Sequence, residues 1–302
     1  MAELRNQSTV TEFILVGFEE LQDLQIPLFL LFLVIYIATM VGNLLIIVLA
    51  VTDQHLHTPM YFFLGNLSCL ETCYSSTILP KMLANLLTGG RTISVRGCIA
   101  QLYAFGILAA TECYLLAAMS YDRYLAICKP MHYVSLMNDG ACIQLVAGSW
   151  MIASLIITIL MLLVLQLTFC GSNEIDHFFC DLTPIIRLAC GDTNAVELAG
   201  FINSSIGILP SFLITLASYI CIITTILRIP STTGRQKAFS TCSSHLIVVV
   251  LFYGSLMIVY VLPSTIFSLF YTVLTPLFNP LIYSLRNKEV KEALRKIVKK
   301  YL

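Results

Sequence analysis

Four charged side chains stand out within the long apolar stretches of the sequence, where they could do chemistry or switch a conformation. They are Glu71, Glu112, Asp122 and Arg123. If these stretches cross a membrane, each charge costs roughly 2.5–3.5 kcal/mol on insertion scales, so each calls for a functional explanation. Glu112 precedes Asp122 by ten residues, which corresponds to about 15 Å along a helix. Glu112 is therefore expected near the middle of the membrane.

Glu71 also lies near the middle of its apolar stretch. Antiparallel neighbouring helices would place the carboxyl groups of Glu71 and Glu112 at similar depth, and two buried anions cannot coexist unpaired. Two interpretations remain open. Either one carboxyl is protonated, or a cation such as sodium lies between them with hydroxyl and amide oxygens completing its shell. No other cofactor is expected.

Paired carboxylates also occur in enzymes and transporters. An intramembrane hydrolase is disfavoured because the sequence has no HExxH or GxSxG motif and no basic residue near the pair. A secondary transporter is the main alternative, but transporters usually consist of two corresponding halves, and no such repeat is visible. The absence of a net charge gives no reason to expect nucleic acid as a partner.

The elements that must position these residues are membrane helices. Of the 302 residues, 58% are hydrophobic and 11% charged, whereas soluble domains have about 25% charged residues. A membrane helix needs about 20 mostly apolar residues. The sequence contains seven such runs, so we predict an all-α bundle of seven transmembrane helices over residues 26–285. The predicted spans are 26–51, 59–87, 98–125, 142–167, 196–227, 238–262 and 266–285.

The distribution of lysine and arginine predicts the orientation, because short cytoplasmic loops are enriched in both. With the N-terminus outside, twelve of the seventeen basic residues fall on the cytoplasmic side. Residues 1–25 are then extracellular and lack the pattern of a cleaved secretory signal. Asn6 begins an Asn-Gln-Ser glycosylation triplet in this segment. We therefore expect a multi-pass protein of the plasma membrane.

Cysteines agree with this orientation. Cys98, Cys170, Cys180 and Cys190 fall on the oxidising side, and their spacing allows three connectivities of two disulfides. After the last span, residues 286–302 repeat apolar positions at helical spacing among lysines and arginines. This pattern predicts a basic amphipathic helix on the inner leaflet, with a solvated charged tail as the alternative.

Several longer motifs resemble one receptor family. Asp122-Arg123-Tyr124, Asn279-Pro280-Leu281-Ile282-Tyr283, Asn43 and Trp150 resemble the signature of rhodopsin-like G protein-coupled receptors. The strings PMYFFLGNLS (59–68), MSYDRYLAIC (119–128), KAFSTCSSHL (237–246) and NPLIYSLRN (279–287) are similar to vertebrate odorant receptors. Together the resemblance spans nearly the whole chain.

The resemblance implies a mechanism. A small-molecule odorant in the outer half of the bundle would favour an outward swing of the sixth helix, which opens a cytoplasmic crevice for the stimulatory olfactory G protein and so raises cyclic AMP. Arg123 of the Asp122-Arg123-Tyr124 motif and Tyr219 would stabilise the open state. Tyr283, in the motif with Asn279 and Pro280, would change its contacts between the two states.

The resemblance also implies disulfides Cys98–Cys180 and Cys170–Cys190 and makes Tyr253 the toggle residue in place of a tryptophan. One departure concerns the ion site, because Glu71 stands where this family commonly has aspartate. The longer side chain puts ion coordination in doubt, and leaves the fold unaffected.

A ligand cavity in the outer half would be mostly apolar. Its predicted lining residues are Phe105, Gly106, Ala109, Ala110, Asn203, Gly207, Tyr253, Met257 and Tyr260. Helix–helix packing is the alternative interpretation of these small and aromatic residues. The outer half of the third span has no aspartate to bind an amine, and the last span has no lysine for a retinal Schiff base. A neutral volatile ligand fits best.

Overall fold

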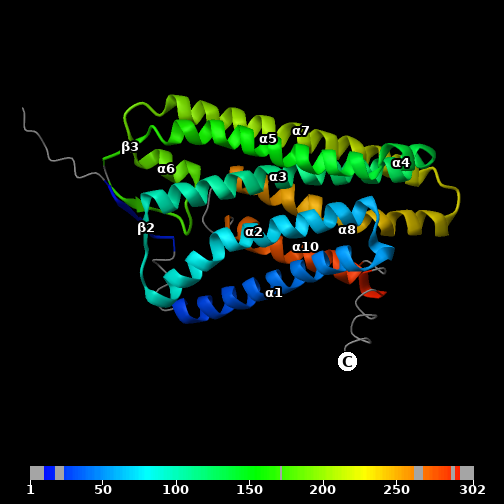
Figure 1. Ribbon diagram of the computed structural model, residues 1–302, viewed down its shortest axis with the longest axis horizontal. Helices are drawn as coiled ribbons and strands as arrows, with labels where there is room; N and C mark the ends of the chain where they lie inside the picture. The colour runs from blue at the N-terminus through cyan, green and yellow to red at the C-terminus, as the bar shows by residue number, and fades with distance from the viewer. Residues whose placement is uncertain (1–9, 18–23, 171, 262–267, 287–289, 293–302) are drawn as a thin grey trace, which may run out of the picture.

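The computed structural model describes residues 10–17, 24–170, 172–261, 268–286 and 290–292. Within these residues, seven long helical segments lie side by side along the length of the molecule (Figure 1). They are α1 (Gln25–Thr52), α2 (Pro59–Thr88), α3 (Val95–Cys128), α5 (Asp139–Val164), α7 (Asn194–Leu227), α8 (Thr232–Val261) and a last segment made of the π-helix η3 (Phe270–Leu274) and α10 (Thr275–Arg286). The predicted all-α bundle is confirmed.

The outer surface of the bundle is apolar. Five described helical segments are long and apolar enough to cross a membrane by composition: α1, α3, α5, α7 and residues 242–259 of α8. On α1, Ile26 is 72% exposed and Val51 is 70% exposed. Because apolar surface of this extent is unfavourable in water, the helices are built to be solvated by lipid.

Local sequence signals determine where several helices begin and end. Pro59 occupies the first turn of α2, where its missing N–H would have no partner. Gly89 ends α2 in the left-handed conformation with φ 68°, which glycine adopts without steric cost. The Ser94 hydroxyl accepts a hydrogen bond from the Gly97 N–H at 3.1 Å and caps α3.

Two differences from the predicted spans stand out. The α8 helix begins at Thr232, six residues before the predicted start at 238, because helical hydrogen bonding continues through polar residues that a search for apolar runs excludes. The last segment contains a π-helical turn at Phe270–Leu274, which the sequence pattern did not predict. Such turns are often found at functional sites.

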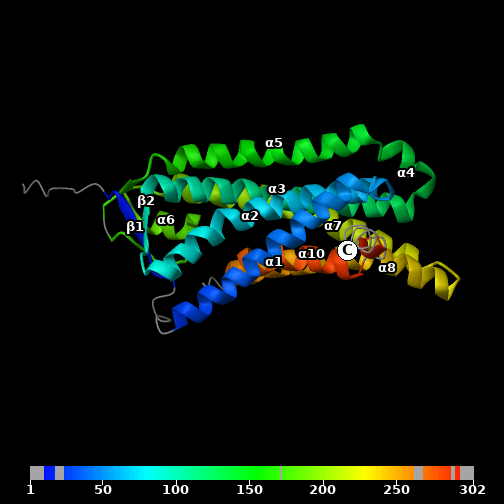
Figure 2. The same cartoon turned by 60° about the horizontal axis from the view of Figure 1, so that its bottom comes forward.

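The two ends of the bundle carry different small elements (Figures 1 and 2). One end, which we call the disulfide end, holds α6 (Leu182–Leu188) and two small sheets. The first sheet has the order β2 (Thr92–Ser94), β1 (Glu12–Leu15), β4 (Glu174–Ile175), and the second pairs β3 (Thr168–Phe169) with β5 (Ala189–Cys190). The opposite Arg123 end holds η2 (Gln54–Leu56), α4 (Pro130–Leu136) and the α7–α8 turn.

The first sheet ties distant segments together. Strand β1 pairs antiparallel with β2 and parallel with β4, with Ile14 opposite Thr92 on one side and Glu174 on the other. Phe13 and Ile175 of this sheet join Cys98 and Cys180 in a buried cluster.

A larger core cluster extends between the helices and contains Phe63, Tyr74, Leu115 and Phe252 among its buried residues. Helix α3 runs through the middle of the bundle and contacts α2, α5, α7 and α8.

Two predictions fall outside the described residues. Asn6, the expected glycosylation acceptor, lies before residue 10. Of the predicted amphipathic segment 286–302, the described part beyond α10 is 290–292, where Val290 is buried and Lys291 is exposed.

Candidate functional site

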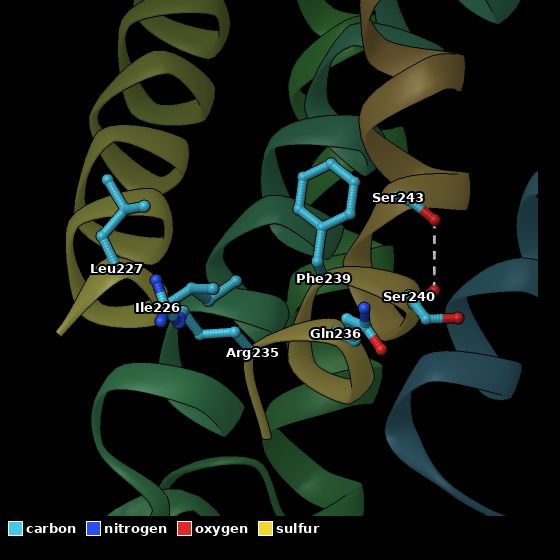
Figure 3. Close-up of a pocket in the computed structure, with 7 residues that line it drawn as sticks. All are labelled: Ile226, Leu227, Arg235, Gln236, Phe239, Ser240 and Ser243. Carbon is cyan, nitrogen blue, oxygen red and sulfur yellow. Dashed lines mark hydrogen bonds between the residues drawn. The ribbon is translucent and has the colours of Figure 1, made fainter. Parts of the chain in front are cut away.

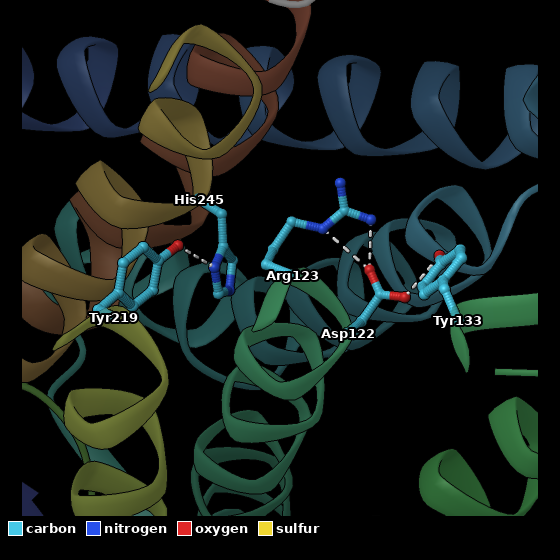
Figure 4. A network of polar contacts seen from close by, with 5 residues as sticks. All are labelled: Asp122, Arg123, Tyr133, Tyr219 and His245. Carbon is cyan, nitrogen blue, oxygen red and sulfur yellow. Dashed lines mark hydrogen bonds and ion pairs between the residues drawn. The ribbon is translucent and has the colours of Figure 1, made fainter. Parts of the chain in front are cut away.

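At the Arg123 end, Asp122 accepts hydrogen bonds from two side chains (Figure 4). The Arg123 Nε donates to Asp122 Oδ2 at 2.9 Å, and a second guanidinium nitrogen donates to the same oxygen. The Tyr133 hydroxyl donates to Oδ1 at 2.8 Å. Asp122 and Arg123 are both buried, so this pair is held in a region of low dielectric. The carboxylate therefore holds Arg123 at the base of α3.

Tyr133 comes from α4, which the sequence did not predict as a helix. Partial burial, with the adjacent negative charge of Asp122 as the second cause, raises the pKa of Tyr133 above its usual value. Its hydroxyl therefore remains a donor to Asp122 at physiological pH. Tyr124, the third residue of the motif, is half-buried and stacks on Tyr121 with a centroid distance of 6.3 Å.

Tyr219 is held by His245, which, like Tyr133, the sequence analysis did not single out. Its hydroxyl lies 2.6 Å from Nδ1 of His245 on α8, and the two rings stack at 5.8 Å (Figure 4). His245 is 4% exposed, and among the described residues its Nε2 has no hydrogen-bond partner. Arg123 lies close enough to His245 to interact electrostatically. The sequence signal that could have identified His245 is that it is a histidine within the apolar sixth span.

Tyr283 completes this cluster. It is 2% exposed and lies close enough to Arg123 and Tyr219 for electrostatic interaction. Pro280, one turn earlier, packs against α1: a Cβ on Gly42 would lie 3.1 Å from the proline ring. The structure thus brings Arg123, Tyr219 and Tyr283 together, as the family motifs imply.

A polar site lies in the middle of the bundle. Glu71 and Glu112 are 0% and 2% exposed, and their side chains lie close enough to interact. The Asn279 amide donates a hydrogen bond to Glu71 Oε1. Asn43 donates to the carbonyl oxygens of Thr39 at 3.0 Å and Pro276 at 3.2 Å, which links α1 to the last segment. The predicted closeness of the two carboxyl groups agrees with this geometry.

Several oxygens at this site lack partners. Among the described residues, Glu71 Oε2, Glu112 Oε1, Ser75 Oγ and the side-chain oxygen of Asn279 are buried without a hydrogen bond. An unpaired buried oxygen is costly, so an additional proton or cation would be favourable here. Carboxylate, hydroxyl and amide oxygens are the donors that a hard cation such as sodium takes. The donor set therefore fits either interpretation made from the sequence.

A continuous row of aromatic rings connects the loop at the disulfide end to α8 and α7. Consecutive centroids are 4.9–6.2 Å apart, within the range of favourable ring pairs. In order, the rings are Phe178, Phe179, Phe105, Tyr74, Tyr271, Phe252, Tyr253 and Phe212. The π-helical turn η3 contains Tyr271. Two predicted ligand residues, Phe105 and Tyr253, belong to this row.

Other predicted cavity residues divide into two groups. Ala109 is half-buried against the main core, and Gly207 is buried, with an added Cβ 3.9 Å from the Tyr114 hydroxyl. Asn203 is half-buried on α7. Gly106 instead faces α5, where an added Cβ would lie 3.2 Å from Ile157. Ala110 packs against the second core cluster, which contains Ile157.

The prediction for Met257 is corrected by the structure. Its side chain is 60% exposed, whereas Phe252 and Tyr253 are buried and Leu256 packs against the core. Consecutive helical residues point about 100° apart. Met257, one residue after the core-packed Leu256, therefore lies off the buried stripe of α8 and faces outward. The side chain of Tyr260 lies outside the described residues.

Two disulfides fix the loop at the disulfide end. Cys98–Cys180 joins α3 to the loop and Cys170–Cys190 closes the loop, as the family pattern implies. The Cys180 N–H donates to Gln101 Oε1 at 3.0 Å, and Gln101 Nε2 donates to the Thr77 carbonyl at 2.9 Å. Gln101 thereby connects α2, α3 and the loop.

His177 is a buried residue of this loop. It is 7% exposed, and its ring centroid is 4.6 Å from those of Phe178 and Phe179. Burial lowers the pKa of His177 from its ordinary value, while Asp181 and Asp176 offset part of this effect. The neutral ring accepts a long hydrogen bond from the Phe179 N–H at 3.5 Å. His177 is thus neutral and packed at physiological pH.

Comparisons with known proteins agree with this architecture. A sequence profile described as "Olfactory receptor" matches residues 32–301. Human olfactory receptor 11L1 is 50% identical over 99% of this chain and 95% of its own length, and human olfactory receptor 6N1 is 50% identical over 98% and 97%. Mouse olfactory receptor 8U9 is 49% identical over 99% and 97%. These are receptors rather than enzymes, and this chain belongs to the olfactory receptor family.

Proposed function

We propose that this protein binds a small, mostly apolar odorant in the half of the bundle nearest the disulfides and activates a stimulatory, olfactory-type G protein at the Arg123 end. The observation that carries this proposal is the pair of buried polar contacts at the Arg123 end. Asp122 holds Arg123, and His245 holds Tyr219. Arg123 and Tyr219 are the two residues that would stabilise an open crevice. In this structure each is bound to a different side chain, Arg123 to Asp122 and Tyr219 to His245.

The chemistry of the cavity supports a neutral ligand. Phe105 and Tyr253 contribute aromatic surface, and Ala109 and Gly207 are small residues on α3 and α7. The Tyr253 hydroxyl lies near Ser211 and Thr215 on α7, which supplies a few hydroxyls for orientation. From Cys98 to Thr111, α3 carries no charged side chain. Apolar pockets with few polar groups bind small hydrophobic molecules.

The aromatic row offers a route from ligand to G protein. A ligand that displaces Phe105 or Tyr253 must repack neighbouring rings, because dense interiors do not leave room for independent movement. Phe252 and Tyr253 lie on α8, eight residues or fewer from His245. Movement of α8 away from α7 would break the Tyr219–His245 contact. Tyr219 would then be available to Arg123, as the family mechanism implies.

The disulfide end and the Arg123 end of the bundle support an orientation of the chain in the membrane. The end with two disulfides belongs on the oxidising side of the membrane. The Arg123 end, with Arg228, Arg235 and Lys291 nearby, belongs on the cytoplasmic side. We therefore propose a plasma-membrane receptor with an extracellular N-terminus, glycosylated at Asn6.

Sodium is proposed as a resident ion in the middle of the bundle. Glu71, Glu112, Ser75 and Asn279 have unpartnered buried oxygens there, and these residues would hold the ion. A bound sodium ion would offset one of the two negative charges of the carboxylate pair. Any preference of the ion for one conformation would shift the equilibrium between resting and active receptor by that differential affinity.

The function is tested by measuring cyclic AMP in cells that express the protein, against a panel of neutral volatile compounds. At least one compound should raise cyclic AMP in a concentration-dependent way, and cells without the protein should not respond. Uptake of a compound by reconstituted protein, with no G protein response at matched surface expression, would instead support a transporter.

A further inference from the structure

A groove separates the end of α7 from the start of α8 at the Arg123 end (Figure 3). Its volume is about 460 Å³. One part of its lining is apolar and the other is polar. The apolar lining residues are Ile226, Leu227 and Phe239, and the polar ones are Arg235, Gln236, Ser240 and Ser243. We propose that this groove binds an anionic phospholipid, with the lipid phosphate at Arg235 and an acyl chain along α7.

The apolar part of the groove faces outward. Leu227 on α7 is 65% exposed and Phe239 on α8 is 51% exposed. Leu227 also ends a stripe on α7. Leu216, Ile220 and Ile223 precede it at helical spacing, and these three side chains are 43–55% exposed. The stripe leads from the groove towards the middle of the membrane, which is the path of an acyl chain.

The polar part of the groove suits a phosphate group. Arg235 is half-buried and extends from α8 towards Ile226 on α7, with its guanidinium nitrogens at the end nearest Ile226 (Figure 3). Ser243 donates to the Ser240 carbonyl at 3.2 Å, which uses its hydroxyl within the helix. The Ser240 and Gln236 side chains are exposed and can donate to a phosphate oxygen.

Charge complementarity selects an anionic lipid over a neutral one. The sequence contains no aspartate or glutamate between Glu197 and Glu289, whereas Arg228 and Arg235 lie on either side of the α7–α8 turn. Within the described part of the chain, no carboxylate forms an ion pair with Arg235. Basic pockets between membrane helices on the cytoplasmic side bind the headgroups of anionic lipids. The unbalanced positive charge of the groove therefore matches a lipid phosphate.

The groove also lies beside the helix that moves in the proposed activation. A lipid that fills the space between α7 and α8 can bias their separation. This consequence depends on the proposed function. Binding of the lipid does not depend on it, so the two are tested separately.

Native mass spectrometry of the purified protein tests the binding. Phosphatidylserine and phosphatidylcholine with the same acyl chains are added in turn, and the affinity of each is measured for the parent protein and for Arg235→Gln. One basic residue near an anionic lipid changes affinity by about fivefold. We expect Arg235→Gln to lose about fivefold in affinity for phosphatidylserine and to leave phosphatidylcholine binding unchanged.

Lys291→Gln is the matched control, because it removes the same charge from an exposed position following α10. Its affinity for phosphatidylserine should fall much less than that of Arg235→Gln. An equal fall in both variants would show diffuse attraction and overturn the proposal. Displacement of phosphatidylserine by millimolar inorganic phosphate would likewise overturn it, because a free phosphate would then be the ligand.

A second measurement locates the lipid even if Arg235→Gln folds poorly. A phosphatidylserine with a photoreactive group in its acyl chain should label α7 between Leu216 and Leu227 in the parent protein. Phe239→Ala, which removes the opposite wall of the groove, should reduce this labelling. Labelling confined to other helices, or unchanged by Phe239→Ala, would contradict the assignment.

Discussion

Tyr133 on α4 donates a hydrogen bond to Asp122 on α3 at 2.8 Å, through the carboxylate oxygen that Arg123 leaves free. Hydrogen bonds to a charged group contribute about 1.5–3 kcal/mol. Tyr133 therefore stabilises the same carboxylate that holds Arg123. The contact connects α4 to the Asp122–Arg123 pair on α3.

The first prediction concerns this carboxylate. Asp122→Asn keeps the shape of the side chain but removes its charge, so Arg123 loses its ion-pair partner and is freed for the active state. Basal cyclic AMP should rise several-fold, and Tyr133→Phe should give a smaller rise in the same direction. Cyclic AMP is measured without odorant and divided by surface expression. Unchanged or lower basal activity in Asp122→Asn would contradict the proposed role.

The second prediction concerns His245. His245→Phe keeps an aromatic ring against Tyr219 but removes the nitrogen at 2.6 Å. A neutral hydrogen bond contributes about 0.5–1.5 kcal/mol, which corresponds to a shift of about two- to tenfold in the resting–active equilibrium. We expect higher basal activity and lower odorant concentrations at half-maximal response. Ser244→Ala, a buried neighbour on α8, serves as control. If both variants behave like the parent, the contact does not restrain α8.

The third prediction concerns pH at the disulfide end. Burial lowers the pKa of His177 below its ordinary value of 6.5 in the folded protein. Between the two pKa values the unfolded state binds more protons, so folding stability falls as pH drops below 6.5. The loss is at most about 1.4 kcal/mol for each pH unit, until the folded-state pKa is reached.

Thermal unfolding of the purified receptor checks this effect. The decrease in midpoint between pH 7.5 and 5.5 should be smaller in His177→Phe than in the parent protein. His132→Phe, at an exposed position on α4, should behave like the parent. An identical decrease in all three proteins would show that His177 is not the group that titrates.

The fourth prediction concerns sodium. Glu112→Gln removes one anionic ligand from the proposed ion site, and cation affinity depends on the charge of the ligands. Basal and odorant-evoked cyclic AMP should depend on sodium in membranes containing the parent receptor and lose that dependence in the variant. If Glu112→Gln reaches the surface and responds like the parent at every sodium concentration, the carboxyl groups share a proton instead.

Much of this arrangement could be predicted from the sequence because it depends on local patterns. Apolar runs predicted the helices, and counting residues along α3 predicted the depth of Glu112 beside Glu71. The disulfide between Cys98 and Cys180 came from the family resemblance and is confirmed. These predictions rest on patterns within one helix or one motif, together with the antiparallel arrangement of neighbouring helices.

Several features that depend on specific contacts between helices were not predicted. The partner of Tyr219 is His245, 26 residues away on another helix, and no spacing rule connects them. Met257 faces outward because the rotation of α8 is determined by the packing of Phe252 and Tyr253. The π-helical turn at Tyr271 likewise changes the register of the last span in a way that hydrophobic periodicity does not reveal.

In the proposed mechanism, odorant binding in the bundle activates a G protein through Arg123. The most direct measurement is nucleotide exchange by a purified stimulatory G protein, added to reconstituted receptor with an odorant that was active in cells. The parent receptor should accelerate exchange in proportion to odorant occupancy, and Arg123→Gln should bind the odorant with no acceleration. Equal acceleration by Arg123→Gln, or none by the parent receptor at saturating odorant, would contradict the account.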